Sequence, residues 1–301
     1  MSCWSAPVLP RSITSIGELD KHTPPRSRLP LREGMLIEGR YLLEQRLGEG
    51  SSSSVFAAED LDLGFEVALK FLTWTSTVGR LRFHRELNLL RTVPHDAIVT
   101  ARDSGRHLGM EYFVMERVQG PNLERWLQDS PEPMPFRRAC RLVGGIARAL
   151  AAVHSRRLLH RDIKPANLLL ETTAAGERLR LIDFGLALPG EAPRITGEHM
   201  TIGTPRYMAP ERWQGKARPA GDVFSLGVCL YELVSRRTPF VGLSPMEVAR
   251  AVMSGRRPIL SEAVPSAPVG LDLLVQEMLA PNPAERPNAA QVARRLGELS
   301  G

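Results

Sequence analysis

The chain has 301 residues, which is enough for one large domain or for two lobes with a substantial core. Its hydrophobic fraction of 43% is ordinary for a soluble globular protein, and no apolar run approaches the roughly 18 residues of a membrane span. The net charge of +6 is scattered among acidic residues without a dense basic run, so we expect no nucleic-acid partner.

The N-terminal region has prolines at positions 7, 10, 24, 25 and 30, and we expect residues 1–34 to form a flexible tail. It has no basic segment followed by an apolar one, so a signal peptide is not predicted. Cys3, Cys140 and Cys229 lie far apart and lack metal-site spacing, which is typical of reduced thiols. Together these features favour a cytoplasmic location.

Strand-like runs begin at Tyr41 and are predicted over 41–47, 55–60 and 65–72. The stretch GEGSSSS between the first two has two readings. Glycine and serine are typical of a flexible linker, but Gly-x-Gly followed by a small residue and a valine is also typical of a phosphate-binding hairpin. The stretch alone does not decide between them.

The next elements complete a small sheet and then a helical region. Apolar spacing predicts a helix over 80–93, and alternation predicts a strand over 111–118. Beyond residue 120 the apolar stripes predict helices, which we place at 136–153, 223–234, 246–253, 271–279 and 289–299. We therefore predict an α+β fold with two lobes: a β-rich one with one main helix (35–118) and a mainly helical one (119–301).

Four motifs with polar residues occur in a fixed order along the chain. VALK ends at Lys70, HRDIKPANLLL occupies 160–170, LIDFGLA contains Asp183, and GTPRYMAPE occupies 203–211. In this order they match the signature set of protein kinases. From Tyr41 to about Leu299 the chain resembles the eukaryotic-like (Hanks-type) Ser/Thr protein kinases, most of all the bacterial ones.

The resemblance implies an enzyme that transfers a phosphoryl group from ATP to Ser or Thr of protein substrates. Asp162 would accept the proton of the substrate hydroxyl, and Lys164 would neutralise charge on the transferring group. Lys70 would hold the α- and β-phosphates and would be oriented by a carboxylate, for which Glu86 is the best candidate. Asn167 and Asp183 would hold Mg²⁺, a hard cation that prefers oxygen ligands.

The same resemblance decides the reading of the Gly/Ser stretch as a phosphate loop. Gly48, Gly50 and Val55 match the family pattern, while Ser53 stands at the position of its third glycine. The resemblance also implies adenine contacts, made by apolar side chains and by the backbone of Glu116 and Val118; the apolar residues are Leu47, Val55, Ala68, Met115 and Leu169. Two further roles are structural: Glu211 is expected to pair with Arg286, and Asp222 to brace the catalytic loop.

Regulation is expected to involve the segment before GTPRYMAPE. In the family an arginine at the position of Arg161 often meets a phosphate on this segment, so we expect autophosphorylation at Thr196 or Thr201. Glu198 could partly substitute for the phosphate, and a constitutively ordered segment is the alternative. A kinase–kinase dimer for trans-autophosphorylation is a possible partner arrangement.

Two other functions are compatible with the fold. A pseudokinase scaffold would be expected to lack one of Lys70, Asp162, Asn167 or Asp183, and all four are present. A small-molecule phosphotransferase of related fold would typically lack the long segment that ends in GTPRYMAPE, which is also present. Both features favour a protein kinase.

Overall fold

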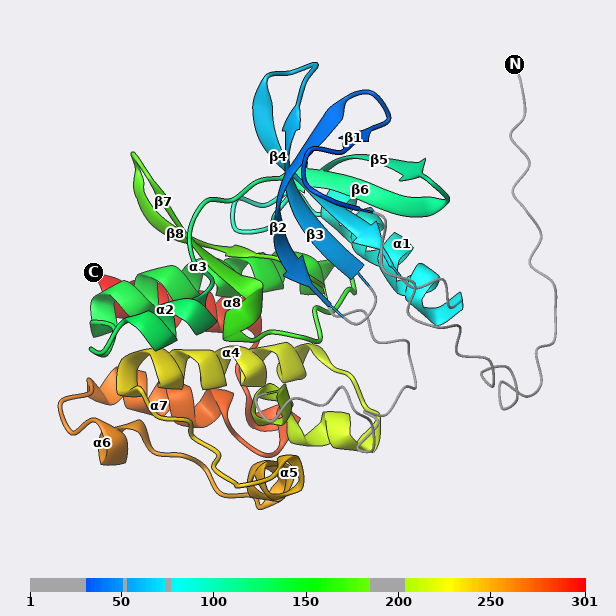
Figure 1. Cartoon of the computed structure of the whole chain (residues 1–301). Helices are drawn as coiled ribbons and strands as arrows, with labels where there is room; N and C mark the ends of the chain where they lie inside the picture. The colour runs from blue at the N-terminus through cyan, green and yellow to red at the C-terminus, as the bar shows by residue number, and fades with distance from the viewer. Residues whose placement is uncertain (1–30, 51–52, 74–76, 185–203) are drawn as a thin grey trace, which may run out of the picture. The chain divides into compact units, whose positions relative to one another are not determined.

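The computed structural model describes residues 31–50, 53–73, 77–184 and 204–301 (Figure 1). The elements named below belong to one compact unit, Glu33–Gly301. Most of the predicted tail and both candidate phosphorylation sites, Thr196 and Thr201, lie outside the described residues.

Within the described residues, the N-terminal half of this unit is an antiparallel six-stranded sheet with the order β1-β2-β3-β4-β6-β5 (Figure 1). Its strands are β1 (Leu36–Ile37), β2 (Tyr41–Glu49), β3 (Ser53–Asp60), β4 (Phe65–Leu72), β5 (Ala101–His107) and β6 (Met110–Glu116). The three strands predicted first form its β2-β3-β4 meander.

Helix α1 (Thr77–Thr92) packs against this sheet. Phe83, Leu87 and Leu90 are buried, and the ring of Phe83 lies 5.0 Å from the ring of Phe113 on β6. Glu86 is three residues from Phe83 and four from Leu90, so it lies on the same face of the helix. When the apolar face of α1 packs against the sheet, the carboxylate of Glu86 therefore also faces the sheet.

The C-terminal half is mainly helical, as predicted. Its helices are α2 (Leu123–Asp129), α3 (Phe136–Ser155), α4 (Pro219–Ser235), α5 (Pro245–Met253), α6 (Leu260–Ala263), α7 (Val269–Met278) and α8 (Ala289–Ser300). Helix α4 is buried from Gly221 to Ser235, as its uniformly apolar sequence predicts. Helix α8 begins with a capping box, in which Asn288 and Gln291 exchange hydrogen bonds.

A two-stranded hairpin, β7 (Leu168–Thr173) and β8 (Gly176–Leu181), lies between the sheet and the helices (Figure 1). A short parallel bridge joins Leu181 to Ile98, and an antiparallel bridge joins Leu169 to Asn122. The one-turn helix η1 (Pro165–Asn167) leads directly into β7. The hairpin therefore holds the segments just before β7 and just after β8 close to the loop around Ile98.

A buried ion pair between Arg286 and Glu211 lies within the C-terminal half. Arg286 donates to both carboxylate oxygens of Glu211, at 2.7 and 2.9 Å, and its side chain is fully buried. The same guanidinium also donates to the backbone carbonyls of Ala220, Ala280 and Pro281. The pairing expected from the sequence is thus present, inside a cluster in which one cation meets one carboxylate and three carbonyls.

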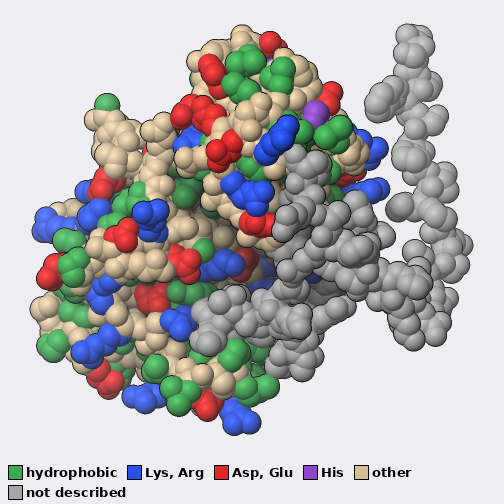
Figure 2. Space-filling view, in the orientation of Figure 1, with side chains coloured by type: hydrophobic (Ala, Val, Ile, Leu, Met, Phe, Trp, Pro, Cys, Tyr) green, Lys and Arg blue, Asp and Glu red, His purple; other side chains and the backbone are tan. Residues whose placement is uncertain are grey.

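Two properties of the chain as a whole can be followed in the structure. On the face shown in Figure 2, basic and acidic side chains are interspersed, so the net charge of +6 is not gathered into one patch there. None of the described helices combines the length and apolar character needed to cross a membrane.

Candidate active site

The centre of the site is a buried lysine between two carboxylates. Lys70 on β4 donates to Oε1 and Oε2 of Glu86 at 2.7 and 2.8 Å, and to Oδ1 of Asp183 at 2.6 Å. The side chains of Lys70 and Glu86 are each 8% exposed, whereas that of Asp183 is 42% exposed. Three segments far apart in the sequence thus bring one positive and two negative charges together.

The close contact of these three charges shifts the pKa values of Lys70, Glu86 and Asp183. Burial lowers the pKa of Lys70, but the charges of Asp183 and Glu86 outweigh it and raise that pKa above its usual range. Burial raises the pKa of Glu86 to about 7, with Asp183 adding to the effect of burial and Lys70 opposing it. Burial also acts to raise the pKa of Asp183, but Lys70 outweighs this and the pKa is lowered. Asp183 therefore remains a carboxylate, while Glu86 titrates near neutral pH.

The catalytic loop brings three predicted residues together. The Asn167 amide donates to the backbone carbonyl of Asp162 at 2.8 Å and to its carboxylate at 3.0 Å. Lys164 Nζ lies 2.8 Å from Asp162 Oδ2, the same carboxylate oxygen that accepts from Asn167. Asp162 keeps a side-chain exposure of 33%, so its carboxylate is held in place and still accessible.

Asp222 on α4 holds the catalytic loop through hydrogen bonds to its backbone. Its carboxylate accepts from the backbone N–H groups of His160 and Arg161, at 2.9 and 2.7 Å. Nε2 of His154, in the last turn of α3, lies 2.8 Å away and must donate, because an ionised carboxylate only accepts. Burial acts to raise the pKa of Asp222, but the hydrogen bond from His154 is among the effects that outweigh it and lower the pKa.

Two residues of the site have left-handed backbone conformations. Arg161 has a φ of 69° and Asp183 a φ of 53°, which side-chain-bearing residues rarely adopt. Asp222 holds Arg161 through its N–H, and the ring of Phe184, next to Asp183, lies 4.4 Å from that of His160. Such strain persists only where the surroundings fix it, and it gathers at functional sites.

The structure describes both ends of the stretch that is expected to form the phosphate loop. The N–H of Gly50 donates to the carbonyl of Ser53 at 2.7 Å, which closes the hairpin between β2 and β3. Ser53 is the first residue of β3 and is not among the residues with positive φ. A glycine is therefore not required there, which explains how serine is accommodated.

The residues expected around adenine come from both halves of the chain; they are Leu47 in β2, Val55 in β3, Ala68 in β4, Met115 and Glu116 in β6, Val118 just after β6, and Leu169 in β7. The register places Val55 opposite Lys70 and Ala68 opposite Met115. Residues opposite or two apart share a face, so these four lie on one face of the sheet. Leu169 belongs to the other sheet, and β6 ends at Glu116 rather than at the predicted Val118.

Asn167 and Asp183 fit the magnesium role that the resemblance implies. The side chain of Asn167 donates to Asp162 through its Nδ2, so its Oδ1 can serve as a ligand, and Asp183 supplies an ionised carboxylate. Among the described residues no group of three or more His, Cys, Asp or Glu could hold a metal by itself. Two protein oxygens completed by substrate phosphates are how Mg²⁺ is usually bound in phosphoryl-transfer sites.

Two residues near the site belong to none of the sequence motifs. His154 supports Asp222, and Arg180 on β8 contacts the side chain of Glu116 at the end of β6. Both act on partners more than 60 positions away, and a single sequence carries no signal for such pairs. A polar residue inside an apolar pattern, such as Arg180 between Leu179 and Leu181, is the only hint.

Residues 41–295 match the model of the protein kinase domain. The chain belongs to the protein kinase family. It is 36% identical over 267 residues to the serine/threonine-protein kinase pkn2 of Myxococcus xanthus, with 86% of this chain covered. It is 35% identical over 277 residues to the serine/threonine-protein kinase PkaA of Streptomyces coelicolor, again with 86% of this chain covered. The matches span 32% and 50% of those two relatives.

Solved structures show the same fold. The kinase domain of Mycobacterium tuberculosis PknI matches with a TM-score of 0.68 and 27% identity, over 89% of this chain and 99% of that domain. The predicted two-lobed kinase fold and the resemblance to bacterial Ser/Thr kinases are thus confirmed.

Proposed function

We propose that this chain is a protein kinase that uses ATP and Mg²⁺ to phosphorylate Ser or Thr hydroxyls of protein substrates. The observation that carries the proposal is the single site that contains Lys70 bound to Glu86 and, in the catalytic loop, Asp162 held by Asn167 and Lys164. The serine/threonine kinases to which the chain is similar support the same substrate class.

The residues of this chain would act mainly by positioning and by neutralising charge. The substrate hydroxyl oxygen attacks the γ-phosphorus, the bond to the β–γ bridging oxygen breaks, and ADP leaves. Asp162 accepts the hydroxyl proton, and Lys164 stabilises the negative charge of the transferring group. Lys70, oriented by Glu86, holds the α- and β-phosphates. Mg²⁺, held by Asn167 and Asp183, would neutralise phosphate charge when bound.

The competing functions are less well supported. A scaffold without catalysis does not need Lys70, Asp162, Asn167 and Asp183 together, and the geometry of each is suited to its expected role. The GTPRYMAPE segment, which ends in the pair between Glu211 and Arg286, favours a protein substrate over a small molecule.

We further propose that activity depends on autophosphorylation at Thr196 or Thr201, in trans within a kinase–kinase dimer, and that the protein acts in the cytoplasm. The domain limits 1–34, 35–118 and 119–301 are part of the same proposal. The double variant Thr196→Ala with Thr201→Ala would lose most of its activity if one of these phosphates orders the segment through Arg161. Full activity of this variant would favour Glu198 or a constitutively ordered segment.

The direct test of the proposed function is Asp162→Asn. We expect autophosphorylation with labelled ATP and Mg²⁺ to fall by about 10²–10⁴-fold, because proton acceptance is lost, while the Kd for ATP changes little. Asp129→Asn, an exposed carboxylate on α2, is the matched control. Unchanged turnover in Asp162→Asn would refute the assigned mechanism.

A further inference from the structure

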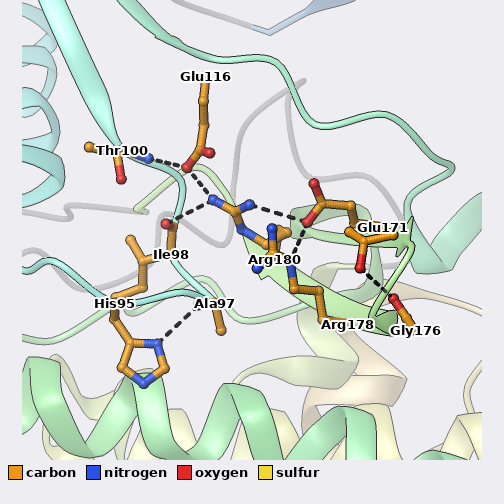
Figure 3. A network of polar contacts seen from close by, with 10 residues as sticks. His95, Ala97, Ile98, Thr100, Glu116, Glu171, Gly176, Arg178 and Arg180 are labelled. Atoms are coloured by element: carbon orange, nitrogen blue, oxygen red, sulfur yellow. Dashed lines mark hydrogen bonds and ion pairs between the residues drawn. The ribbon is translucent and has the colours of Figure 1, made fainter.

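Arg180 lies at the centre of a charged network that includes Glu116 and Glu171 (Figure 3). Its guanidinium donates to Glu116 on one side and to Glu171 on the other, where Nη1 lies 3.2 Å from Oε2. Its Nη2 also donates to the backbone carbonyl of Ile98 at 3.3 Å. The Arg180 side chain is only 4% exposed, whereas those of Glu116 and Glu171 are 23% and 16% exposed. Water therefore has little access to replace these contacts.

The network joins the two sheets. Glu116 is the last residue of β6 in the six-stranded sheet, and Arg180 belongs to β8 in the hairpin. Next to this contact, Leu181 and the loop around Ile98 exchange backbone hydrogen bonds: Leu181 N–H donates to Ala97 at 2.7 Å, and Val99 N–H donates to Leu181 at 3.1 Å. The Arg180 side chain and the Leu181 backbone thus tie the end of β6 and this loop to the same strand.

Arg180 is three residues before Asp183. The N–H of Ile182, the first residue after β8, donates to the backbone carbonyl of Asn167 at 3.0 Å. The segment that follows Arg180 is therefore also bound to Asn167, the other expected magnesium ligand. The base-binding end of the site and its phosphate-binding end are therefore connected through Arg180.

The local conformation of Glu116 does not depend on Arg180. Its N–H donates to the carbonyl of Thr100 at 3.2 Å, and its carboxylate accepts from the N–H of Thr100 at 2.8 Å. Loss of Arg180 would leave both bonds in place. It would remove the charged contact between the two sheets.

We propose that Arg180, acting through Glu116, is a positioning residue that fixes the adenine-binding end of β6 relative to Asp183. This inference rests on the proposed function, because it assigns adenine to β6 and the phosphates to Asp183. A ligand that reaches both ends would lose affinity when the contact is removed, whereas a ligand that occupies only the adenine end would not.

The test compares Arg180→Met with Arg178→Met. Arg178 is also on β8 and binds the same Glu171, but its hydrogen bond and ion pair go to Glu171 and not to Glu116, and its side chain is 45% exposed. Calorimetry would give the Kd of each variant for ATP with Mg²⁺ and for adenosine alone. For Arg180→Met we expect ATP affinity to fall about tenfold and adenosine affinity to stay within about twofold, because only ATP spans both ends of the site. Arg178→Met should change neither.

Two further variants keep the inference falsifiable if Arg180→Met does not fold. Glu116→Gln should also lower the affinity for ATP but not that for adenosine. If Glu116 and Arg180 act through one contact, the double variant Glu116→Gln with Arg180→Lys should lose no more ATP affinity than the more affected single variant. Equal loss of ATP and adenosine affinity, no loss, or tighter ATP binding would each overturn the inference. A wild-type protein that binds ATP without transferring phosphate would refute the proposed function but leave this comparison readable.

Discussion

Two buried cations of this protein are surrounded very differently. Arg286 meets one carboxylate and three backbone carbonyls, so its positive charge is matched and all its partners are fixed. Lys70 meets two carboxylates, Glu86 and Asp183, which leaves one negative charge unmatched whenever Glu86 is ionised. The first cluster is complete without a ligand, whereas the second retains an excess of negative charge that a bound cation would compensate. The difference in charge balance between these two clusters parallels their expected roles, which are structural for Arg286 and functional for Lys70.

The largest effect should come from breaking the complete cluster. Arg286→Met leaves Glu211 buried without its cation, and we expect the free energy of unfolding to fall by about 3–5 kcal/mol. Denaturant unfolding measures this loss. Arg257→Met, which removes an exposed ion pair with Glu285, is the control and should cost about 1 kcal/mol or less. If Arg286→Met and Arg257→Met lost the same free energy of unfolding, burial would not account for the stabilising effect of the Arg286 cluster.

Breaking the unmatched cluster should affect activity more than folding. Lys70→Met removes the group expected to hold the phosphates, and we expect kcat to fall by about 10²–10³-fold. Thermal unfolding and the phosphorylation rate should be measured on the same preparation. A variant that loses as much stability as Arg286→Met but keeps most of its kcat would reverse the contrast with Arg286.

The unmatched charge should also make this cluster sensitive to pH. The pKa of Glu86 is raised to about 7, so the folded state holds a proton that the unfolded state releases near pH 4.5. The contribution of Glu86 to stability therefore falls as the pH rises from about 5 to about 7, because the unfolded state binds fewer protons there. Glu86→Gln should lack this dependence when unfolding free energies at pH 5 and pH 7.5 are compared. If the unfolding free energies of the wild type and of Glu86→Gln changed equally between pH 5 and pH 7.5, the raised pKa of Glu86 would be contradicted.

The smallest effect is expected at the rim of the site. Ser53→Gly restores the family pattern in a residue that already has strand conformation, so stability should change by less than about 1 kcal/mol. The KM for ATP should change more than the melting temperature. A large loss of thermal stability would mean that the serine hydroxyl is structurally engaged.

The sequence allowed the fold to be predicted where apolar periodicity was strong. Helices α3, α4 and α8 lie within a few residues of their predicted limits. Strand β5 was not predicted, because ARDSGRH alternates in burial but contains few apolar residues, and GERLRL in β8 has the same weakness. Polar strands are stabilised by neighbours that only the tertiary structure supplies.

The candidate site shows a similar limit. The residues inside motifs could be named from their order alone, but their geometry could not. Nothing local indicates that Asp183 has positive φ. Arg180 and Glu116 are 64 positions apart, so their contact depends on how the two sheets meet. Contacts of this kind become visible only when the chain is folded.

The scarcity of lysine has a practical consequence for chemical labelling. The chain has four lysines, of which Lys70 is buried, Lys164 is half-buried and Lys216 is exposed, while Lys21 lies outside the described residues. Only the neutral amine attacks an acylating reagent, and Lys70 is both shielded and held in its ammonium form by Asp183 and Glu86. Lys216 therefore reacts well before Lys70, and the few modified peptides can be assigned individually by mass spectrometry. With so few amines, the modification of half-buried Lys164 in the candidate site can be followed against a low background.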